Sequence, residues 1–279
     1  MQVTNELVKE SFDCKISKRE ITDRVDDLLD LETILKYCKS INERVYYEED
    51  FLNIEIANGI TIRDVLEFTQ MDIFYGPKRE QYLFLQEMIS KNCKRKEQEC
   101  DNENVIYCSC GKYQSSASNL QEYAFARQGY LEKIKKHEEY NDFMRTCFPN
   151  TIFSNDCEKE LGKIQHFSKH VKEITKMLSV LDENAIEIYK KWQPDTSSAM
   201  AEIQALAGRE CSNDPKHKET LIFEFECDDK GIKSIECQPH LKLIRRDSDL
   251  RIYFYWRDSK VGNGEKVLVG RIGRHTWKK

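Results

Sequence analysis

Hydrophobic residues recur at helical spacing through most of residues 1–208. Between Ser17 and about Asn42, the spacing of three or four residues is kept by Ile21, Val25, Leu28, Leu29, Leu31, Ile34 and Leu35. Ser17, followed three positions later by Glu20, has the form of a capping box. The pattern therefore predicts a helix that begins near Ser17. After it, we expect a hairpin over residues 52–62 with an Asn58-Gly59 turn, and short helices over 63–70 and 79–91.

Two longer helical patterns follow. The first runs from Asn119 to about Cys147 and ends at Phe148-Pro149-Asn150. The second opens near Ser154 and keeps helical spacing through Leu161, Ile164, Phe167, Val171, Ile174, Met177, Leu178 and Leu181. We expect the helical spacing of the apolar residues to shift at residues 182–184, after which the helix continues to Trp192. A last helix is predicted over 197–207, with Gly208 in a left-handed C-cap.

The hydrophobic period changes after Gly208. Arg209 to Glu219 forms a polar connection, and strand patterns follow at residues 220–226, 232–237, 240–245, 250–257 and 266–272. Helices followed by a run of antiparallel strands are typical of an α+β protein. We therefore expect a mainly helical domain with a small hairpin over residues 1–208 and an antiparallel β-sheet domain over residues 209–279.

The strand at 250–257 separates two kinds of side chain. Because successive strand residues point to opposite faces, one face carries Arg251, Tyr253, Tyr255 and Arg257, and the other carries Ile252, Phe254 and Trp256. The apolar face suits burial. The face of guanidinium and phenol groups suits a polyanion or an aromatic base, which makes Tyr253, Tyr255 and Arg257 candidate RNA-binding residues.

Charge is distributed unevenly along the chain. Residues 240–279 contain eleven Lys and Arg against four Asp and Glu, whereas residues 1–239 contain 33 basic and 45 acidic residues. A basic segment of this kind favours an anionic partner such as RNA. Lys and Arg also protect sheet edges from aggregation, which is a structural alternative. The acidic helical region could cover the basic sheet or bind a separate protein inhibitor or partner.

A segment of about 40 of the 279 residues carries a further pattern. It reads P-H-L-K-L-I-R-R-D-S-D-L-R-I-Y-F-Y-W and, after a loop, E-K-V-L-V-G-R-I-G-R-H. This segment resembles the C-terminal half of the RelE/HigB-type toxins, small RNases of bacterial toxin–antitoxin systems. The resemblance implies a RelE-like sheet domain and an endoribonuclease of toxin or phage-defence type. It matches Lys242 to the basic position before the turn, Arg251 to the arginine that opens a strand, and Arg271, Arg274 and His275 to the basic end.

The residue types in this segment suit metal-independent cleavage of RNA. Such cleavage needs a base for the 2′-hydroxyl proton, a cation at the phosphate and an acid for the leaving oxygen. We expect His240 and His275 to exchange the protons, Arg251 and Lys242 to hold the phosphate, and Arg271 with Arg274 to stabilise the transition state. No cofactor or metal is needed. The structural alternative is that both histidines are strand-end residues bonded to backbone.

Two other functions remain open. The carboxylates Glu224, Glu226, Asp228, Asp229 and Glu236 could serve a metal-dependent nuclease, although the sequence lacks the expected E-x-K motif. Alternatively, the basic sheet is a non-catalytic module that binds nucleic acid or protein.

Eleven cysteines occur in a chain without an apolar leader or a run long enough for a membrane span. We expect reduced thiols, a cytoplasmic location and no membrane partner. Four of these cysteines, Cys93, Cys100, Cys108 and Cys110, lie in one polar stretch and could complete a zinc site, but no C-x-x-C pair is present. His166 and His170 are four residues apart on a predicted helix. This spacing suits either a solvated pair or a pair of metal ligands.

Overall fold

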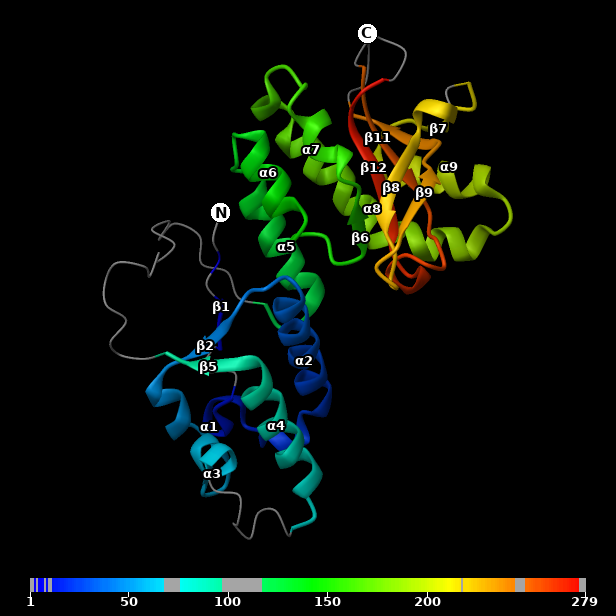
Figure 1. Ribbon diagram of the computed structural model, residues 1–279. Helices are drawn as coiled ribbons and strands as arrows, with labels where there is room; N and C mark the ends of the chain where they lie inside the picture. Colours follow the sequence, from blue (N-terminus) through cyan, green and yellow to red (C-terminus); the bar gives the residue numbers. More distant parts are fainter. Residues whose placement is uncertain are drawn as a thin grey trace. The chain divides into compact units, whose positions relative to one another are not determined.

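The structure is a computed structural model that describes residues 3, 5–7, 9, 12–67, 76–96, 117–216, 218–243 and 249–275. It contains both helices and sheets, which confirms the α+β class (Figure 1). The chain divides into two compact units, residues 1–126 and residues 127–279. No helix among the described residues has the length and apolar character to cross a membrane.

The first unit alternates short strands with helices. Its described elements, in order, are β1 (Asn5–Glu6), α1 (Cys14–Ser17), η2 (Ile21–Asp23), α2 (Val25–Ser40), β2 (Val45–Tyr47), η3 (Glu49–Asn53), β3 (Glu55–Ala57), β4 (Ile60–Thr61), α3 (Ile62–Glu67), α4 (Arg79–Asn92) and β5 (Cys93–Arg95). Strands β1, β2 and β5 form a parallel sheet in that order.

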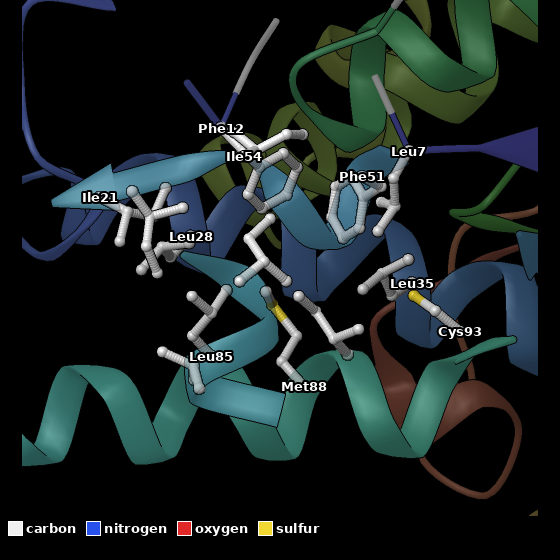
Figure 2. Packing of buried hydrophobic residues seen from close by; sticks show 14 of the residues in the cluster. Leu7, Phe12, Ile21, Leu28, Leu35, Phe51, Ile54, Leu85, Met88 and Cys93 are labelled. Atoms are coloured by element: carbon white, nitrogen blue, oxygen red, sulfur yellow. The ribbon is translucent and has the colours of Figure 1, made fainter. Parts of the chain in front are cut away.

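One apolar cluster joins the elements of this unit. Figure 2 shows Leu85 and Met88 of α4 beside residues of the preceding segments. Phe12 and Phe51 meet edge to face, with ring centroids 5.1 Å apart. Edge-to-face pairs of this kind add to the burial of apolar area, so these rings help to hold the short elements together.

The helix predicted from Ser17 is interrupted in the structure. The N-cap of α1 is Asp13, whose carboxylate accepts from Lys15 N and Ile16 N. Lys18 then takes a left-handed conformation at φ 57°, which ends this helix before α2 begins. Ser17 donates its hydroxyl to Arg19 O, so the predicted capping box does not start a helix here.

The predicted hairpin and the two short helices after it are confirmed. Strands β3 and β4 pair in antiparallel fashion, and Gly59 supplies the positive φ of 71° in the turn between them. Helix α4 coincides closely with the predicted range 79–91, and α3 covers residues 63–67 of the predicted range 63–70, whose last three residues lie outside the described part of the chain.

The second unit places helices around a larger sheet. Its described elements are α5 (Leu120–Leu131, which begins just before the unit), α6 (His137–Met144), β6 (Thr151–Phe153), α7 (Asp156–Leu161), η5 (Phe167–Lys169), α8 (Val171–Trp192), α9 (Thr196–Ala207), β7 (Cys211–Asn213), η6 (Lys218–Thr220), β8 (Ile222–Glu226), β9 (Ile232–Glu236), β10 (Pro239–Lys242), β11 (Leu250–Tyr255), η7 (Gly262–Gly264) and β12 (Val267–Arg274).

Five of these strands form one mixed sheet in the order β6-β12-β11-β10-β7. Strand β6 runs parallel to β12, with Thr151 opposite Val267, whereas the pairs among β12, β11, β10 and β7 are antiparallel. The boundary expected near Arg209 is therefore corrected: a strand from residues 151–153 completes the sheet, and the compact unit begins at residue 127.

The β8–β9 hairpin packs against one face of this sheet. Its inward residues Phe223, Phe225 and Ile235 form a cluster with Tyr253 and Leu268 of the sheet. The contact is close at Gly270, where a Cβ atom would lie 2.2 Å from the Phe223 ring. Gly270 also falls at the irregularity in the pairing of β11 with β12. A residue without a side chain is thus required where the hairpin meets the sheet.

The long helical patterns divide differently from the prediction. Residues 119–147 form α5 and α6, and the pattern from Ser154 divides into α7, η5 and α8. Helix α8 continues through residues 182–184 without a reset, because Asp182 faces inward and is 5% exposed. Helix α9 is confirmed, with Gly208 left-handed at φ 62° as its C-cap.

Candidate functional site

Strands β10 and β11 bring four candidate side chains to one face of the sheet. His240 lies directly opposite Tyr253, and Lys242 lies opposite Arg251. Residues directly opposite in a sheet point to the same face, as do residues two apart on one strand. The face predicted from the sequence for Arg251 and Tyr253 is therefore confirmed, and the register adds His240 and Lys242 to it.

The end of the described chain adds a second imidazole to this group. His275 follows β12, and its backbone N–H donates to Asp249 O at 2.6 Å. Its ring centroid lies 6.1 Å from that of His240 and 6.3 Å from that of Tyr253. The His240 and Tyr253 rings are 5.1 Å apart. Side chains separated by more than thirty positions in the sequence thus meet in one cluster.

Asp214, which follows β7, orients His275. One of its carboxylate oxygens lies 3.3 Å from His275 Nε2, and both side chains are largely buried, at 8% and 11% exposure. The Asp214 backbone N–H donates to Gln238 O, which fixes the loop beside β10. A carboxylate at this distance stabilises a protonated imidazole. The sequence pattern does not indicate Asp214, because it lies in a polar connection without periodicity.

His240 is buried within the sheet and is held as a neutral imidazole. Burial lowers the pKa of His240 to about 4, and the Arg251 charge also lowers it. Its Nδ1 lies 3.4 Å from Gln238 O, and its Nε2 lies 3.3 Å from Ser212 Oγ. These contacts fit the tautomer with its proton on Nδ1, in which Nε2 accepts from the serine hydroxyl.

We define the histidine cluster as His240, His275, Asp214, Tyr253 and Arg251. Arg251 is half-buried, and its Nη1 donates to Leu250 O at 2.9 Å. Burial lowers the pKa of its guanidinium, but arginine stays charged in proteins. The cluster thus holds two imidazoles, one cation and one carboxylate, which are groups that can move protons and bind an anion.

Other predicted basic residues have acidic partners. Lys242 forms an ion pair with Glu210. Arg271 lies opposite Tyr253 on β12, and its Nη2 contacts Glu160 of α7 at 2.7 Å. Both remain next to the cluster, yet each charge is already balanced by a carboxylate.

Two of the predicted arginines lie away from the cluster. Arg274 pairs with Leu250, so the register places it on the opposite face of the sheet from Arg251. The expectation that Arg271 and Arg274 together stabilise the transition state is corrected, because the register places these two side chains on opposite faces of the sheet. Arg257 follows the far end of β11 and lies 3.7 Å from Glu265.

The two candidate base-stacking tyrosines have different environments. Tyr253 is fully buried beneath the β8–β9 hairpin, so its ring offers no face to a base in this structure. Tyr255 is half-buried, and burial raises the pKa of its phenol. Of the two, Tyr255 is the one that a ligand can reach.

The carboxylates considered for a metal-dependent nuclease do not converge. Asp228 accepts from Gly262 N and Asn263 N at 2.9 Å, which gives it a structural role in a loop. Glu224 and Glu226 are exposed on the outer side of β8. Among the described residues, no three His, Cys, Asp or Glu side chains are grouped so as to hold a metal ion.

Of the cysteines and histidines considered as zinc ligands, the structure describes Cys93, His166 and His170. Cys93 is a buried free thiol, and burial raises its pKa to about 12. Cys100, Cys108 and Cys110 lie outside the described residues. His166 and His170 flank the short η5 helix and do not share one helix face, as His166 is left-handed at φ 53°.

A pocket of about 450 Å³ lies at the end of the sheet where β10 begins and β11 ends. Its walls come from β9, from the ends of α8, β7 and β11, and from the starts of α9 and β10. The sequence pattern does not reveal this pocket, because its walls come from six separate segments.

Comparison of the chain with protein-family models, with curated proteins and with solved structures finds no match.

Proposed function

We propose that the chain is a metal-independent endoribonuclease whose active site is the histidine cluster. The observation that carries the proposal is the meeting of two imidazoles, His240 and His275, with ring centroids 6.1 Å apart beside Arg251. Two proton-transfer groups and one cation can together accelerate cleavage of a phosphodiester by its own 2′-hydroxyl. A role in toxin or phage-defence systems is an extension of the resemblance in residues 239–275.

The proposed reaction removes a proton from the attacking 2′-hydroxyl and delivers a proton to the leaving 5′-oxygen. The 2′-hydroxyl oxygen forms a bond to phosphorus as its proton passes to Ser212 Oγ, and the serine proton passes to His240 Nε2, 3.3 Å away. The bond from phosphorus to the 5′-oxygen breaks, and His275 donates a proton to that oxygen. The products are a 2′,3′-cyclic phosphate and a free 5′-hydroxyl, so atoms and charge balance.

Electrostatics support this division of roles. His240 is neutral at pH 7 because its pKa is about 4, so it is in the form that accepts a proton. A bound phosphodiester anion would raise that pKa toward the working pH. The Asp214 carboxylate, 3.3 Å from His275 Nε2, orients the imidazole that is proposed to donate the proton. Arg251 contributes a charge that does not titrate.

The test is cleavage of single-stranded RNA in the presence of EDTA by the full chain and by His275→Asn. Loss of a general acid typically costs about 10²–10⁴-fold in rate, and we expect a loss in this range. His166→Asn is the matched control, because His166 is an exposed histidine in the same unit whose left-handed backbone suits asparagine. That variant should cleave at the parent rate.

Equal rates for His275→Asn and the parent would contradict the proposed role of the cluster. Cleavage that requires Mg²⁺ would favour the carboxylate alternative. RNA binding that weakens steeply with salt, without cleavage, would indicate a non-catalytic module.

A further inference from the structure

One wall of the pocket at the end of the sheet is the edge of β9, to which no other strand of the described residues pairs. Strand β9 pairs with β8, and the bonds Cys237 N to Leu221 O and Cys227 N to Gly231 O fix which residues bond across the hairpin. Because antiparallel residues alternate between bonded and non-bonded pairs, the backbone groups of Ser234 and Glu236 point away from β8. Both residues line the pocket, which therefore offers backbone donors and acceptors to a ligand.

The charges around the pocket favour a ligand that donates hydrogen bonds. Lys233 Nζ lies 2.6 Å from Asp258 Oδ2, so this cation is already neutralised. Glu236 Oε1 accepts from Gln238 Nε2 at 2.5 Å, which leaves Oε2 of the same carboxylate for a ligand. One unbalanced negative charge disfavours a phosphate group inside the pocket and favours N–H donors.

Aromatic residues also line the pocket. Tyr189 of α8 stacks on Trp256, with ring centroids 5.3 Å apart and an interplanar angle of 9°. Tyr255 is half-buried and also lines the pocket. Aromatic walls combined with a few polar groups are typical of sites for flat heterocycles, and nucleobases bind proteins by stacking and by edge hydrogen bonds.

The pocket is adjacent to the histidine cluster along two strands. Gln238 precedes His240 by two residues, and Tyr255 follows Tyr253 by two residues, a separation of about 7 Å along a strand. The Gln238 carbonyl oxygen lies 3.4 Å from His240 Nδ1, so the residue that touches Glu236 also touches the cluster. A base in the pocket and its own phosphodiester at the cluster are thus within the reach of one nucleotide.

We propose that this pocket binds a guanine base of the RNA substrate. The choice of a base linked to a phosphodiester rests on the proposed nuclease function. Guanine carries two adjacent donors, N1–H and the N2 amino group, which match Oε2 of Glu236 and the remaining acceptor site of its Oε1. The O6 atom of guanine accepts from a backbone N–H. Glu236 and the open β9 edge supply these partners. Adenine, cytosine and uracil do not present two such donors beside an acceptor.

The first experiment measures binding of guanosine, adenosine, cytidine and uridine to the full chain by titration calorimetry. Guanosine should bind at least about tenfold more tightly than the others, since a two-bond base contact discriminates by this amount or more. In Glu236→Gln the preference should fall about tenfold or more, because the amide still accepts from Gln238 but loses the charge. Glu226→Gln, an exposed carboxylate on the same hairpin, should bind as the parent does.

The second experiment separates this inference from the nuclease proposal. RNA of each single-base composition is incubated with the parent and with Glu236→Gln in EDTA. Guanosine binding without cleavage of any RNA would support the pocket assignment and overturn the nuclease function. Cleavage without preference for guanine, unchanged in Glu236→Gln, would overturn the pocket assignment and keep the nuclease function. Failure of every nucleoside to bind at millimolar concentration, or tighter binding of another base, would also overturn the assignment.

Discussion

Asp182 is a buried carboxyl group that joins α8 to the first strand of the sheet. Its Oδ1 accepts from Asn150 N and from Thr151 Oγ1, both at 2.8 Å. Burial raises its pKa from 3.8 to about 7, although the two hydrogen bonds lower it. The carboxyl group thus fixes the start of β6 while remaining largely protonated at mildly acidic pH.

Asp182 should make the folded state less stable as pH rises from about 4 to 7. Within this window the folded chain retains a proton that the unfolded chain has lost, so unfolding is favoured by higher pH. A difference of about three pKa units corresponds to at most about 4 kcal/mol. Asp182→Asn should remove this slope, since the asparagine oxygen can accept both hydrogen bonds. Urea unfolding of both proteins at about pH 4, 5.5 and 7 measures how the free energy of unfolding changes with pH.

Glu187→Gln is the control for this experiment, because Glu187 is an exposed carboxylate on the same helix. Its pH profile should match that of the parent. A slope that persists in Asp182→Asn would mean that another group controls stability in this range.

Single residues of the candidate site differ in how far the sequence could indicate them. Strand alternation alone predicts that Arg251 and Tyr253 share a face, whereas only the register adds His240 and Lys242 to that face. The burial of Tyr253 could not be predicted in the same way, because it depends on the β8–β9 hairpin that covers this side chain. Asp214 was missed, since it stands in a loop and reaches His275 only through the pairing of β7 with β10.

At the scale of elements, the close contact between β12 and the β8–β9 hairpin depends on Gly270. A methyl group there would lie 2.2 Å from the Phe223 ring, well inside van der Waals contact. Gly270→Ala should therefore destabilise the fold by about 1–3 kcal/mol, as overpacking of a core does. Chemical denaturation measures the change, and Phe223→Leu in the same chain should recover part of it.

The matched control is Gly129→Ala in α5, where a Cβ atom would have no neighbour within 4 Å. Alanine at this helical position should stabilise by about 0.5–1 kcal/mol. If Gly270→Ala were as stable as the parent, the hairpin would have room to move away from the sheet.

Local signals predicted those elements whose partners are close in sequence. The Asn58-Gly59 turn, the C-cap at Gly208 and the β11–β12 pairing are confirmed because each is specified by adjacent residues. The parallel pairing of β6 with β12 was not predicted, since three residues carry too short a pattern to indicate a strand. The breaks at Lys18 and His166 were also missed, because neither residue type marks a left-handed position.

At the scale of the whole chain, the position of the boundary between units decides which fragment can fold. The sheet needs β6 at its edge, and its apolar face needs a covering layer, because Ile252, Phe254 and Ile272 are fully buried. A fragment of residues 209–279 contains four of the five sheet strands but lacks β6, α8 and α9. It would expose that apolar face to water.

A fragment of residues 118–279 should therefore fold on its own, whereas residues 209–279 should not. The longer fragment keeps α5 intact, with Asn119 Oδ1 accepting from Glu122 N at its start, and retains the buried Arg127, whose Nε donates to Thr146 O at 2.6 Å. Thermal unfolding followed by circular dichroism should show a single cooperative transition for it. The shorter fragment should aggregate or lack a transition, since it leaves a large apolar surface without cover. A cooperative transition in residues 209–279 would instead mean that the strands after Gly208 form a sheet that is stable without the helices, as the charge and strand patterns first indicated.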